Sequence, residues 1–290
     1  MNIEPLEDPI RPVTVQDLLR HTSGIVLGYS NGTLIHQMYH NANLYEDDKP
    51  LSVFINKLSK LPLAHQPGTV WEYGLSYYVL GRIVEVVSGI PLDRFVAERI
   101  AKPLHMTDTA FYLTAMQAAR AAEPQVDLST GKRPDLGEIA DLTQEKQKLL
   151  SGDEGLLTTA GDFARFCQML LNGGELDGVR LLSPKTLAVM TADQVPPSAS
   201  RVDTAGLQDI APVPELGQSY GLGVAVRTAA GHSPVSGSVG DFFWAGYGGT
   251  YFWVDPQEKL FAVMMVQMDF DQSANYRRAL RELVYGALLK

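Results

Sequence analysis

The stretch from Gln66 to Gly89, QPGTVWEYGLSYYVLGRIVEVVSG, constrains the fold more than any other part of the chain. Its Pro67-Gly68 pair is a turn signal. From Leu75 onward apolar residues recur at helical spacing, and the final glycine is typical of a helix C-cap. The pattern predicts a buried helix that begins directly after two aromatic residues, Trp71 and Tyr73. A tyrosine in that position is either a core aromatic or a phenol presented to a reacting group, and the stretch alone favours the core.

Composition and charge exclude several classes of protein. Of the 290 residues, 45% are hydrophobic and 20% are charged, which is the usual balance of a globular chain. No apolar run approaches the roughly 18 residues of a membrane span, and the first residues carry no signal-peptide pattern, so we expect a cytoplasmic location for the chain as given. A net charge of −9 and no basic run longer than Arg277-Arg278 disfavour nucleic acid as a partner. The single cysteine, Cys167, excludes an intrachain disulfide.

The order of periodic segments predicts an α/β protein of the α+β type. We expect loops over Ile25–Asn43, Thr191–Gln218 and, apart from short helical pieces, Thr107–Gly155. Cap residues and apolar spacing predict helices at Thr14–Arg20, Pro50–Leu61, Leu75–Ser88, Pro91–Leu104, Ala115–Ala122, Thr143–Leu150, Leu156–Gly174, Ser183–Met190 and Ser273–Leu289. Period-two segments predict strands at Ser219–Arg227, Gly248–Val254 and Leu260–Met268, the last two joined as a hairpin by the turn Asp255–Glu258.

We interpret residues 1–290 as one domain. It would consist of a helical subdomain at roughly 14–190 and a C-terminal sheet and helix at roughly 215–290.

Most generic signals for chemistry are absent. There is no G-x-S-x-G elbow, no H-E-x-x-H motif and no glycine-rich phosphate loop after a strand, so we expect neither a metal nor an organic cofactor. His36 and His40 lie four residues apart without a carboxylate nearby in sequence, and we interpret them as surface residues.

The segment Phe242–Pro256, FFWAGYGGTYFWVDP, is the second stretch with a possible role in chemistry. Its three glycines, Gly246, Gly248 and Gly249, allow a ligand to approach the backbone of an edge strand closely, where N–H groups can hold a developing oxyanion. A tight bend before a strand explains the same glycines equally well.

Five segments in order resemble the serine β-lactamase and penicillin-binding-protein-like superfamily, in particular its class C β-lactamase-like branch with the family VIII carboxylesterases. The resemblance extends from about Thr14 to the C-terminus. The segments are LLRHTSG (Leu18–Gly24), QPGTVWEYGLSYYVLGRIVE, PLHMTDTAF (Pro103–Phe111), EGLLTTAGDFARFCQMLLNGGELDGVRLLSPKT (Glu154–Thr186) and WAGYGGTYFWVDP.

The resemblance implies acyl transfer through an acyl-serine. Tyr73 stands at the family's Y-x-N or Y-x-x tyrosine, which helps to activate the serine and to protonate the leaving group. Trp244-Ala245-Gly246 stands where β-lactamases have a K-T-G-type triad and the carboxylesterases commonly have W-G-G. The backbone N–H of Tyr247 would be an oxyanion donor, and Trp244 and Trp71 would shape the acyl pocket.

Two departures from the family bear on specificity. Leu75 replaces the asparagine of Y-x-N and so removes an amide donor. Trp244 replaces the triad lysine, whose hydrogen bond to a β-lactam carboxylate would contribute roughly 1.5–3 kcal/mol. Both changes favour small neutral esters over β-lactams or D-Ala-D-Ala peptides.

The family's nucleophile motif is missing from its expected place. S-x-x-K should lie well upstream of the HTSG segment, but its only occurrence is Ser129–Lys132, in a Gly- and Pro-containing turn far downstream. We therefore expect the chain to lack the N-terminal portion of the family. The favoured explanation is a misplaced coding start, with an upstream segment lost. The alternatives are a non-catalytic relative that only binds a ligand or partner and, least favoured, an oligomer contact or a second polypeptide segment that completes the sheet and supplies the serine.

The sequence thus favours a carboxylesterase that acts on small ester or amide substrates. One alternative is a catalytically silent relative that binds a ligand or partner. Another is a β-lactamase or D-Ala-D-Ala carboxypeptidase, against which Trp244 and Leu75 argue.

Overall fold

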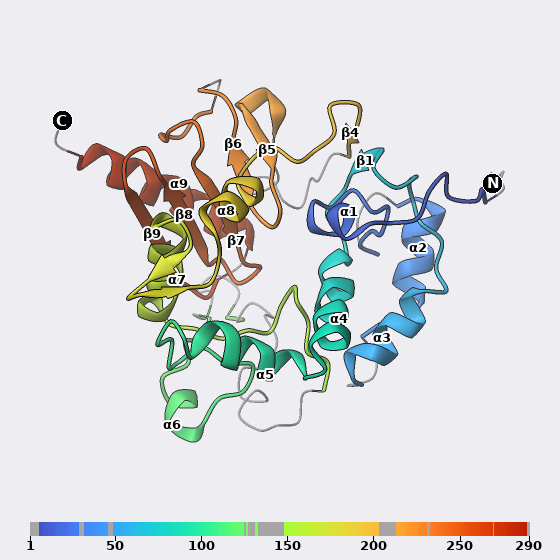
Figure 1. Ribbon diagram of the computed structural model, residues 1–290, viewed down its shortest axis with the longest axis horizontal. Coiled ribbons are helices and arrows are strands. Elements are labelled where there is room, and N and C mark those ends of the chain that lie inside the picture. Colours follow the sequence, from blue (N-terminus) through green and yellow to red (C-terminus); the bar gives the residue numbers. More distant parts are fainter. Residues whose placement is uncertain are drawn as a thin grey trace. The chain divides into compact units, whose positions relative to one another are not determined.

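A computed structural model describes residues 6–28, 32–45, 49–124, 126, 131–132, 148–202, 213–230, 233–268 and 270–288. The chain divides into two compact units whose segments alternate along the sequence (Figure 1). The first unit comprises Met1–Val96, Gln147–Gly155 and Gln194–Leu207, and the second comprises Ala97–Lys146, Leu156–Asp193 and Gln208–Lys290.

The first unit is mainly helical. A parallel pair of short strands, β1 and β4, joins Val70 to Ser200 and Trp71 to Arg201. The elements of this unit are α1 (Val15–Leu19), α2 (Leu34–Asn41), α3 (Leu51–Leu58), β1 (Val70–Trp71), α4 (Ser76–Ser88), α5 (Leu92–Val96) and β4 (Ser200–Arg201).

Helix α4 is the centre of the first unit. Its C-cap Gly89 adopts the left-handed conformation with φ of 72°, as the sequence pattern predicted. Phe54 of α3 stacks on Tyr78 of α4 with ring centroids 4.3 Å apart, within a core that also holds Leu51, Leu58 and Leu75.

Two glycines, Gly152 and Gly81, bring the segment 148–155 against α4. A Cβ on Gly152 would lie 2.6 Å from the carbonyl oxygen of Tyr77, and one on Gly81 would lie 3.1 Å from the nitrogen of Gly152. Because a Cβ would clash at Gly152 and would be crowded at Gly81, the backbone at Gly152 passes directly over the helix. This close approach fixes the position of Asp153.

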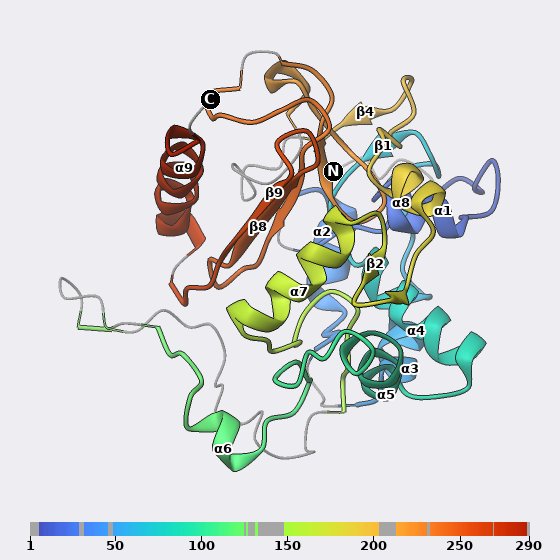
Figure 2. The ribbon, with the colours of Figure 1, turned by 60° about the vertical axis from the view of Figure 1, so that its left-hand side comes forward.

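The second unit contains an antiparallel sheet in the order β5-β6-β7-β8-β9. Helices α7 and α9 lie on opposite faces of it (Figure 2). The elements of this unit are a π-helical turn (Ala97–Ala101), α6 (Ala115–Ala118), α7 (Ala160–Leu171), β2 (Glu175–Leu176), β3 (Val179–Arg180), α8 (Pro184–Met190), a 3-10 turn (Pro214–Leu216), β5 (Gln218–Tyr220), β6 (Ala225–Arg227), β7 (Phe242–Ala245), β8 (Tyr251–Asp255), β9 (Leu260–Met264) and α9 (Phe270–Gly286).

Helix α7 begins after Thr159, four residues later than the predicted Leu156, because the Thr159 hydroxyl accepts the N–H of Asp162 and caps the helix. Its apolar face packs on the sheet, with the ring of Phe163 5.1 Å from that of Phe252 in β8. Cys167 and Val254 are fully buried in this core. The sequence-based grouping placed α7 and α8 in the helical part of residues 14–190. They instead share a compact unit with the sheet because α7 covers one of its faces.

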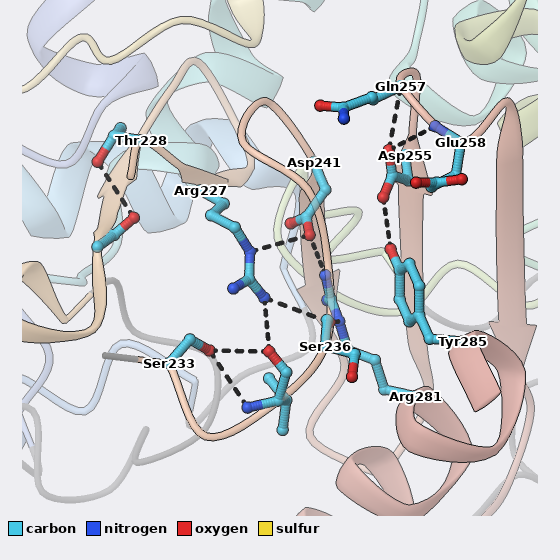
Figure 3. A network of polar contacts seen from close by, with 12 residues as sticks. Arg227, Thr228, Ser233, Ser236, Asp241, Asp255, Gln257, Glu258, Arg281 and Tyr285 are labelled. Atoms are coloured by element: carbon cyan, nitrogen blue, oxygen red, sulfur yellow. Dashed lines mark hydrogen bonds and ion pairs between the residues drawn. The ribbon is translucent and has the colours of Figure 1, made fainter. Parts of the chain in front are cut away.

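A buried ionic network joins α9 to the sheet (Figure 3). The carboxylate of Asp241 accepts hydrogen bonds from Arg227 of β6 and Arg281 of α9, and all three residues are buried. Arg281 also donates to the carbonyl of Ser236 at 2.7 Å and to the hydroxyl of Tyr251 at 2.9 Å. The guanidinium of Arg281 is therefore a central link between α9 and the sheet.

The predicted helices near α1, α3, α4, α5, α6, α7, α8 and α9 are present, and the β8–β9 hairpin with its Asp255–Glu258 turn is confirmed. Asp255 holds that turn by accepting the N–H groups of Gln257 and Glu258 at 3.0 Å each. The predicted helix at Thr143–Leu150 lies mostly outside the described residues.

Two predictions of local structure were wrong. The segment Ile25–Asn43, predicted as loop, contains α2, which Thr33 caps by accepting the N–H of His36. Ser219–Arg227, predicted as one strand, is a hairpin of β5 and β6 that turns at Gly221–Val224. Gly223 has φ of 101° in that turn, a conformation that other residues rarely adopt.

None of the helices in the described part of the chain is both long enough and apolar enough to cross a membrane.

Candidate active site

Tyr73 lies between the end of β1 at Trp71 and the start of α4 at Ser76. Its side chain is partly buried, and its hydroxyl donates a hydrogen bond to Oδ1 of Asp153 at 2.8 Å. The two residues are 80 positions apart in sequence. The start of α4 thus places a phenol and a carboxyl group in direct contact.

Burial changes the pKa of both groups in the same direction. Burial and then the neighbouring Asp153 raise the pKa of the Tyr73 phenol well above its ordinary value. Burial, together with the charge of Glu154, raises the pKa of Asp153 to about 6, although the hydrogen bond from Tyr73 opposes this shift. At neutral pH the pair is therefore a protonated phenol and a carboxyl group that titrates near the working pH of most enzymes.

His21 packs against the same phenol. Its ring centroid lies 4.5 Å from that of Tyr73 and 4.9 Å from that of Tyr77, and its Nδ1 accepts the N–H of Gly74 at 3.3 Å. Complete burial lowers the pKa of His21 to about 3, so the imidazole is neutral at pH 7. A neutral ring in this place orients Tyr73 by packing and adds no charge.

Glu72, next to Tyr73, is held between two histidines. Its buried carboxylate lies 2.8 Å from Nε2 of His36 and 2.6 Å from Nε2 of His65. Burial raises the pKa of Glu72, but the hydrogen bonds from His65 and His36 outweigh it, and the net effect lowers the pKa. His36 is therefore not the surface residue that the sequence suggested, because the fold brings a carboxylate to it; His40 is exposed, as expected.

No cluster of His, Cys, Asp and Glu among the described residues has the arrangement of a metal site.

Trp71 and Leu75 lie on either side of Tyr73 in sequence, and both are buried. The ring of Trp71 meets His21 edge-on at 6.3 Å, so it packs in the interior of the first unit. Leu75 contributes to the wall of a cavity of about 310 Å³, which is also lined by Leu27, Gly28, Tyr39, His40, Asn41, Asn43, Leu44 and Tyr45.

The tryptophan motif lies in the second unit, at the end of β7. Trp244 and Ala245 pair with Phe252 and Tyr251 of β8, and the ring of Trp244 meets Tyr220 edge-on at 5.3 Å. The glycines that follow form a tight turn into β8, in which Gly246 and Thr250 are hydrogen-bonded at 2.9 Å.

The expectation of an edge strand here was wrong, because β7 lies between β6 and β8. The pairing of β7 with β6 nevertheless involves only Phe242 and Phe243, so Trp244 and Ala245 extend beyond it. Tyr247 lies in the turn and not on a strand, with its side chain 73% exposed. Its role as an oxyanion donor stays a prediction.

The sequence-predicted residues thus fall into two groups. Trp71, Tyr73 and Leu75 belong to the first unit, whereas the segment Trp244–Tyr247 belongs to the second.

Sequence reasoning missed Asp153 and His21 as neighbours of Tyr73. His21 lies in the HTSG motif but was not singled out. Asp153 lies between two glycines of a polar segment with no helical or strand period, where no local pattern marks a partner of a distant residue.

No described residue is identified as the nucleophile. Ser129 of the S-x-x-K sequence lies outside the described residues. Ser76, three positions after Tyr73, is fully buried, with its Oγ 2.8 Å from that of Ser23.

A helical unit with a phenol before its central helix, and a second unit of helices packed on an antiparallel sheet, define the class of the serine β-lactamases and penicillin-binding proteins. The Beta-lactamase family model matches residues 4–286, so the chain belongs to this family of serine hydrolases.

Two relatives show what the chain is similar to. An uncharacterized protein of Mycobacterium tuberculosis is 34% identical over 89% of this chain and 63% of its own length. The lovastatin esterase of Penicillium rubens is 30% identical over 97% of this chain and 72% of its own length. The chain thus spans less than two thirds of the length of the Mycobacterium tuberculosis relative.

The fold itself is shared with a solved structure of EstCE1, a hydrolase with promiscuous acyltransferase activity. Its TM-score is 0.78 at 23% identity, over 97% of this chain and 74% of that one.

Proposed function

We propose that the protein hydrolyses small neutral carboxylic esters through a serine-type acyl-transfer reaction. The observation that carries the proposal is the Tyr73 phenol, which is held at the start of α4 by Asp153 and remains protonated at neutral pH. Family membership supports the reaction type, and the similarity to an esterase supports the ester as substrate.

Each residue has a role in this proposal. Tyr73 acts as general acid and base on the attacking hydroxyl and the leaving alkoxide. The backbone N–H of Tyr247 stabilises the oxyanion. Trp244 shapes the acyl pocket beside Ala245 and Gly246, whereas the buried Trp71 packs on His21.

Trp244 and Leu75 determine the choice of substrate in this proposal. Neither side chain carries a cation or an amide, so neither offers a charge-assisted hydrogen bond to a β-lactam or peptide carboxylate. A neutral ester has no carboxylate that needs such a hydrogen bond, so its binding is not weakened at these two positions.

Hydrolysis of p-nitrophenyl butyrate, compared with that of nitrocefin, tests the proposal. We expect turnover of the ester only, and kcat lower by about 10²–10⁴-fold in Tyr73→Phe because a proton-transfer group is removed. Tyr276→Phe is the matched control, since Tyr276 is an exposed tyrosine of α9. Equal activity of the wild type and Tyr73→Phe would contradict the role of Tyr73.

A fluorophosphonate probe followed by peptide mass spectrometry identifies the nucleophile. The probe is applied to the 290-residue chain and to a version that includes any in-frame sequence found upstream of the Met1 codon in the gene. Labelling of one serine in either protein supports a serine hydrolase, and the labelled peptide shows where that serine lies.

The second candidate is a catalytically silent relative that binds a ligand or partner. It is favoured by one observation, namely that the single S-x-x-K sequence of the chain lies downstream of the HTSG segment, whereas the family has its nucleophile motif upstream of that segment. Absence of both labelling and turnover in both proteins would support it. Preferential hydrolysis of nitrocefin or of a D-Ala-D-Ala peptide would instead support the β-lactamase or carboxypeptidase alternative.

A further inference from the structure

Asp153 is built into the first unit, although it comes from a segment far from α4 in sequence. Its backbone N–H donates to Oγ of Ser151 at 2.9 Å, and the preceding Gly152 passes over the carbonyl of Tyr77. The side chain of Asp153 is partly buried and accepts the proton of the Tyr73 hydroxyl at 2.8 Å. The backbone of residues 151–153 therefore keeps the carboxylate of Asp153 against the hydroxyl of Tyr73, which lies just before α4.

We propose that Asp153 is the proton acceptor behind Tyr73, and that the two form a relay through which the attacking hydroxyl is deprotonated. This inference rests on the proposed hydrolase function. It identifies Asp153, a residue of this chain, as the base that finally accepts the proton of the attacking hydroxyl.

The proton balance of the relay is simple. As the nucleophile's oxygen attacks the ester carbon, its proton passes to Oη of Tyr73, and the phenolic proton passes to Oδ1 of Asp153. Tyr73 stays neutral throughout, and Asp153 becomes a neutral carboxylic acid. When the tetrahedral intermediate collapses, the proton returns from Asp153 through Tyr73 to the leaving alkoxide, which departs as an alcohol.

The charges around the pair favour proton transfer from the Tyr73 hydroxyl to the carboxylate of Asp153. A free phenolate at Tyr73 is disfavoured by burial and by the neighbouring Asp153, so Tyr73 is a poor base on its own. Asp153, with its pKa raised to about 6 by burial and by Glu154, is ionised at pH 7 but takes up a proton more readily than an ordinary carboxylate.

Other titratable groups also act on Tyr73. Glu154 and Tyr77 are the further titratable groups that act on Tyr73, and the neutral ring of His21 packs on it. Glu154 accepts the hydroxyl proton of the buried Tyr78, and it acts on Tyr73 through its charge. A substitution of Glu154 can therefore serve as a control that changes the charge near Tyr73 but keeps the hydrogen bond between Tyr73 and Asp153.

Nuclear magnetic resonance of protein labelled with [ζ-13C]tyrosine tests the pairing without any substrate. The Tyr73 resonance is assigned by its loss in Tyr73→Phe. In the wild type we expect this resonance to shift with a midpoint near pH 6 as Asp153 ionises. In Asp153→Asn this step should vanish, and the phenol should ionise at a lower pH than in the wild type because a neighbouring negative charge is gone.

Glu154→Gln is the matched control. The step should persist and move to lower pH, because the charge of Glu154 contributes to the raised pKa of Asp153. A Tyr73 resonance without a step between pH 5 and 7, or a step that survives in Asp153→Asn, would overturn the pairing.

Kinetics test the relay itself. On p-nitrophenyl butyrate we expect kcat of Asp153→Asn to fall by about 10²-fold with little change in KM, and the acid limb near pH 6 to disappear from the pH profile. Asp153→Glu, which keeps the carboxylate, should recover part of kcat. A purely structural role of Asp153 would leave the acid limb in place.

The two proposals fail in different ways. If the wild type hydrolyses esters and Asp153→Asn keeps its rate and pH profile, the relay is wrong and the hydrolase function stands. If no ester is hydrolysed by the wild type but the resonance step is present, the hydrolase function and the relay are wrong and only the proton coupling of the two side chains remains.

Discussion

Asp17 is a buried carboxylate that binds three neighbouring residues around α1 of the first unit. It is fully buried in α1 and accepts hydrogen bonds from Arg11 at 2.6 Å, Arg20 at 2.9 Å and the hydroxyl of Thr14 at 2.7 Å. Burial raises the pKa of Asp17, but the hydrogen bonds from Arg11, Thr14 and Arg20 outweigh it, and the net effect is a pKa well below the usual range.

The lowered pKa of Asp17 makes stability depend on pH. Because the folded-state pKa is below the unfolded value of about 3.9, the stabilisation is present above that value and is lost as pH falls through the folded pKa. We expect Asp17→Asn to lower the free energy of unfolding by about 1.5–3 kcal/mol at pH 7, the usual range for hydrogen bonds to a charged group. The difference from the wild type should shrink below about pH 4.

Urea unfolding at pH 7 and at pH 3.5 measures both effects. Glu175→Gln is the control, because Glu175 is an exposed residue paired with the exposed Arg180, and its loss should cost about 0.5 kcal/mol or less. A difference between Asp17→Asn and the wild type that is the same at both pH values would contradict the account.

At the residue scale, sequence reasoning found groups with a local signature and missed those without one. Tyr73 could be identified because it precedes a strongly periodic helix within a family motif. Asp153 could not, because its contact depends on two glycines that let a distant segment cross α4. The burial of His36 was also missed, because its partner Glu72 is 36 residues away and no local pattern links the two.

Among the elements, α9 depends on Arg281 for its attachment to the sheet. Besides its hydrogen bonds, the guanidinium lies 5.2 Å from the ring centroid of Trp253 and 5.5 Å from that of Phe243. Its removal would leave the charge of Asp241 buried with Arg227 alone.

We expect Arg281→Met to destabilise the protein by about 3–5 kcal/mol, because it breaks a buried ion pair and leaves the carbonyl of Ser236 and the hydroxyl of Tyr251 without this donor. Asp241→Asn should cost less in this background than in the wild type, because its bond to Arg281 is already lost, so the two changes should not be additive in a double-mutant cycle. Thermal or urea unfolding of the four proteins measures the coupling. Arg278→Met, at an exposed position of the same helix, should be close to neutral, and additive effects of the first pair would contradict the network.

Three capped helices were predicted well, but α2 was missed although Thr33 caps it. Thr14, Thr159 and Ser183 each accept the backbone N–H that their cap position predicts. The division of Ser219–Arg227 into β5 and β6 was missed because Gly221 and Gly223 were not recognised as a turn. The strand β7 was similarly hidden by the glycines after it, although its register with β8 determines where Trp244 lies.

For the molecule as a whole, Cys167 provides a specific probe of unfolding. It is the only cysteine of the 290-residue sequence, it is fully buried in α7, and burial raises the pKa of its thiol to about 12. We expect no reaction with Ellman's reagent in the native protein and one equivalent after denaturation. Leu170→Ala, which opens a cavity in the same core, should speed the native reaction, while Leu283→Ala at an exposed position should not. Rapid labelling of the native wild type would contradict the burial of this thiol.

The alternation of the two units along the chain has a consequence for how this protein can be divided. Residues 1–96 alone would contain Tyr73 without Asp153, and β1 without its neighbour β4, because residues 147–155 and 194–207 return to the first unit. Recombination or splitting of the gene at a single point between the units would therefore separate partners that belong together. Divergence of such a protein is expected to proceed by exchange of residues within each unit, and not by exchange of one unit for another.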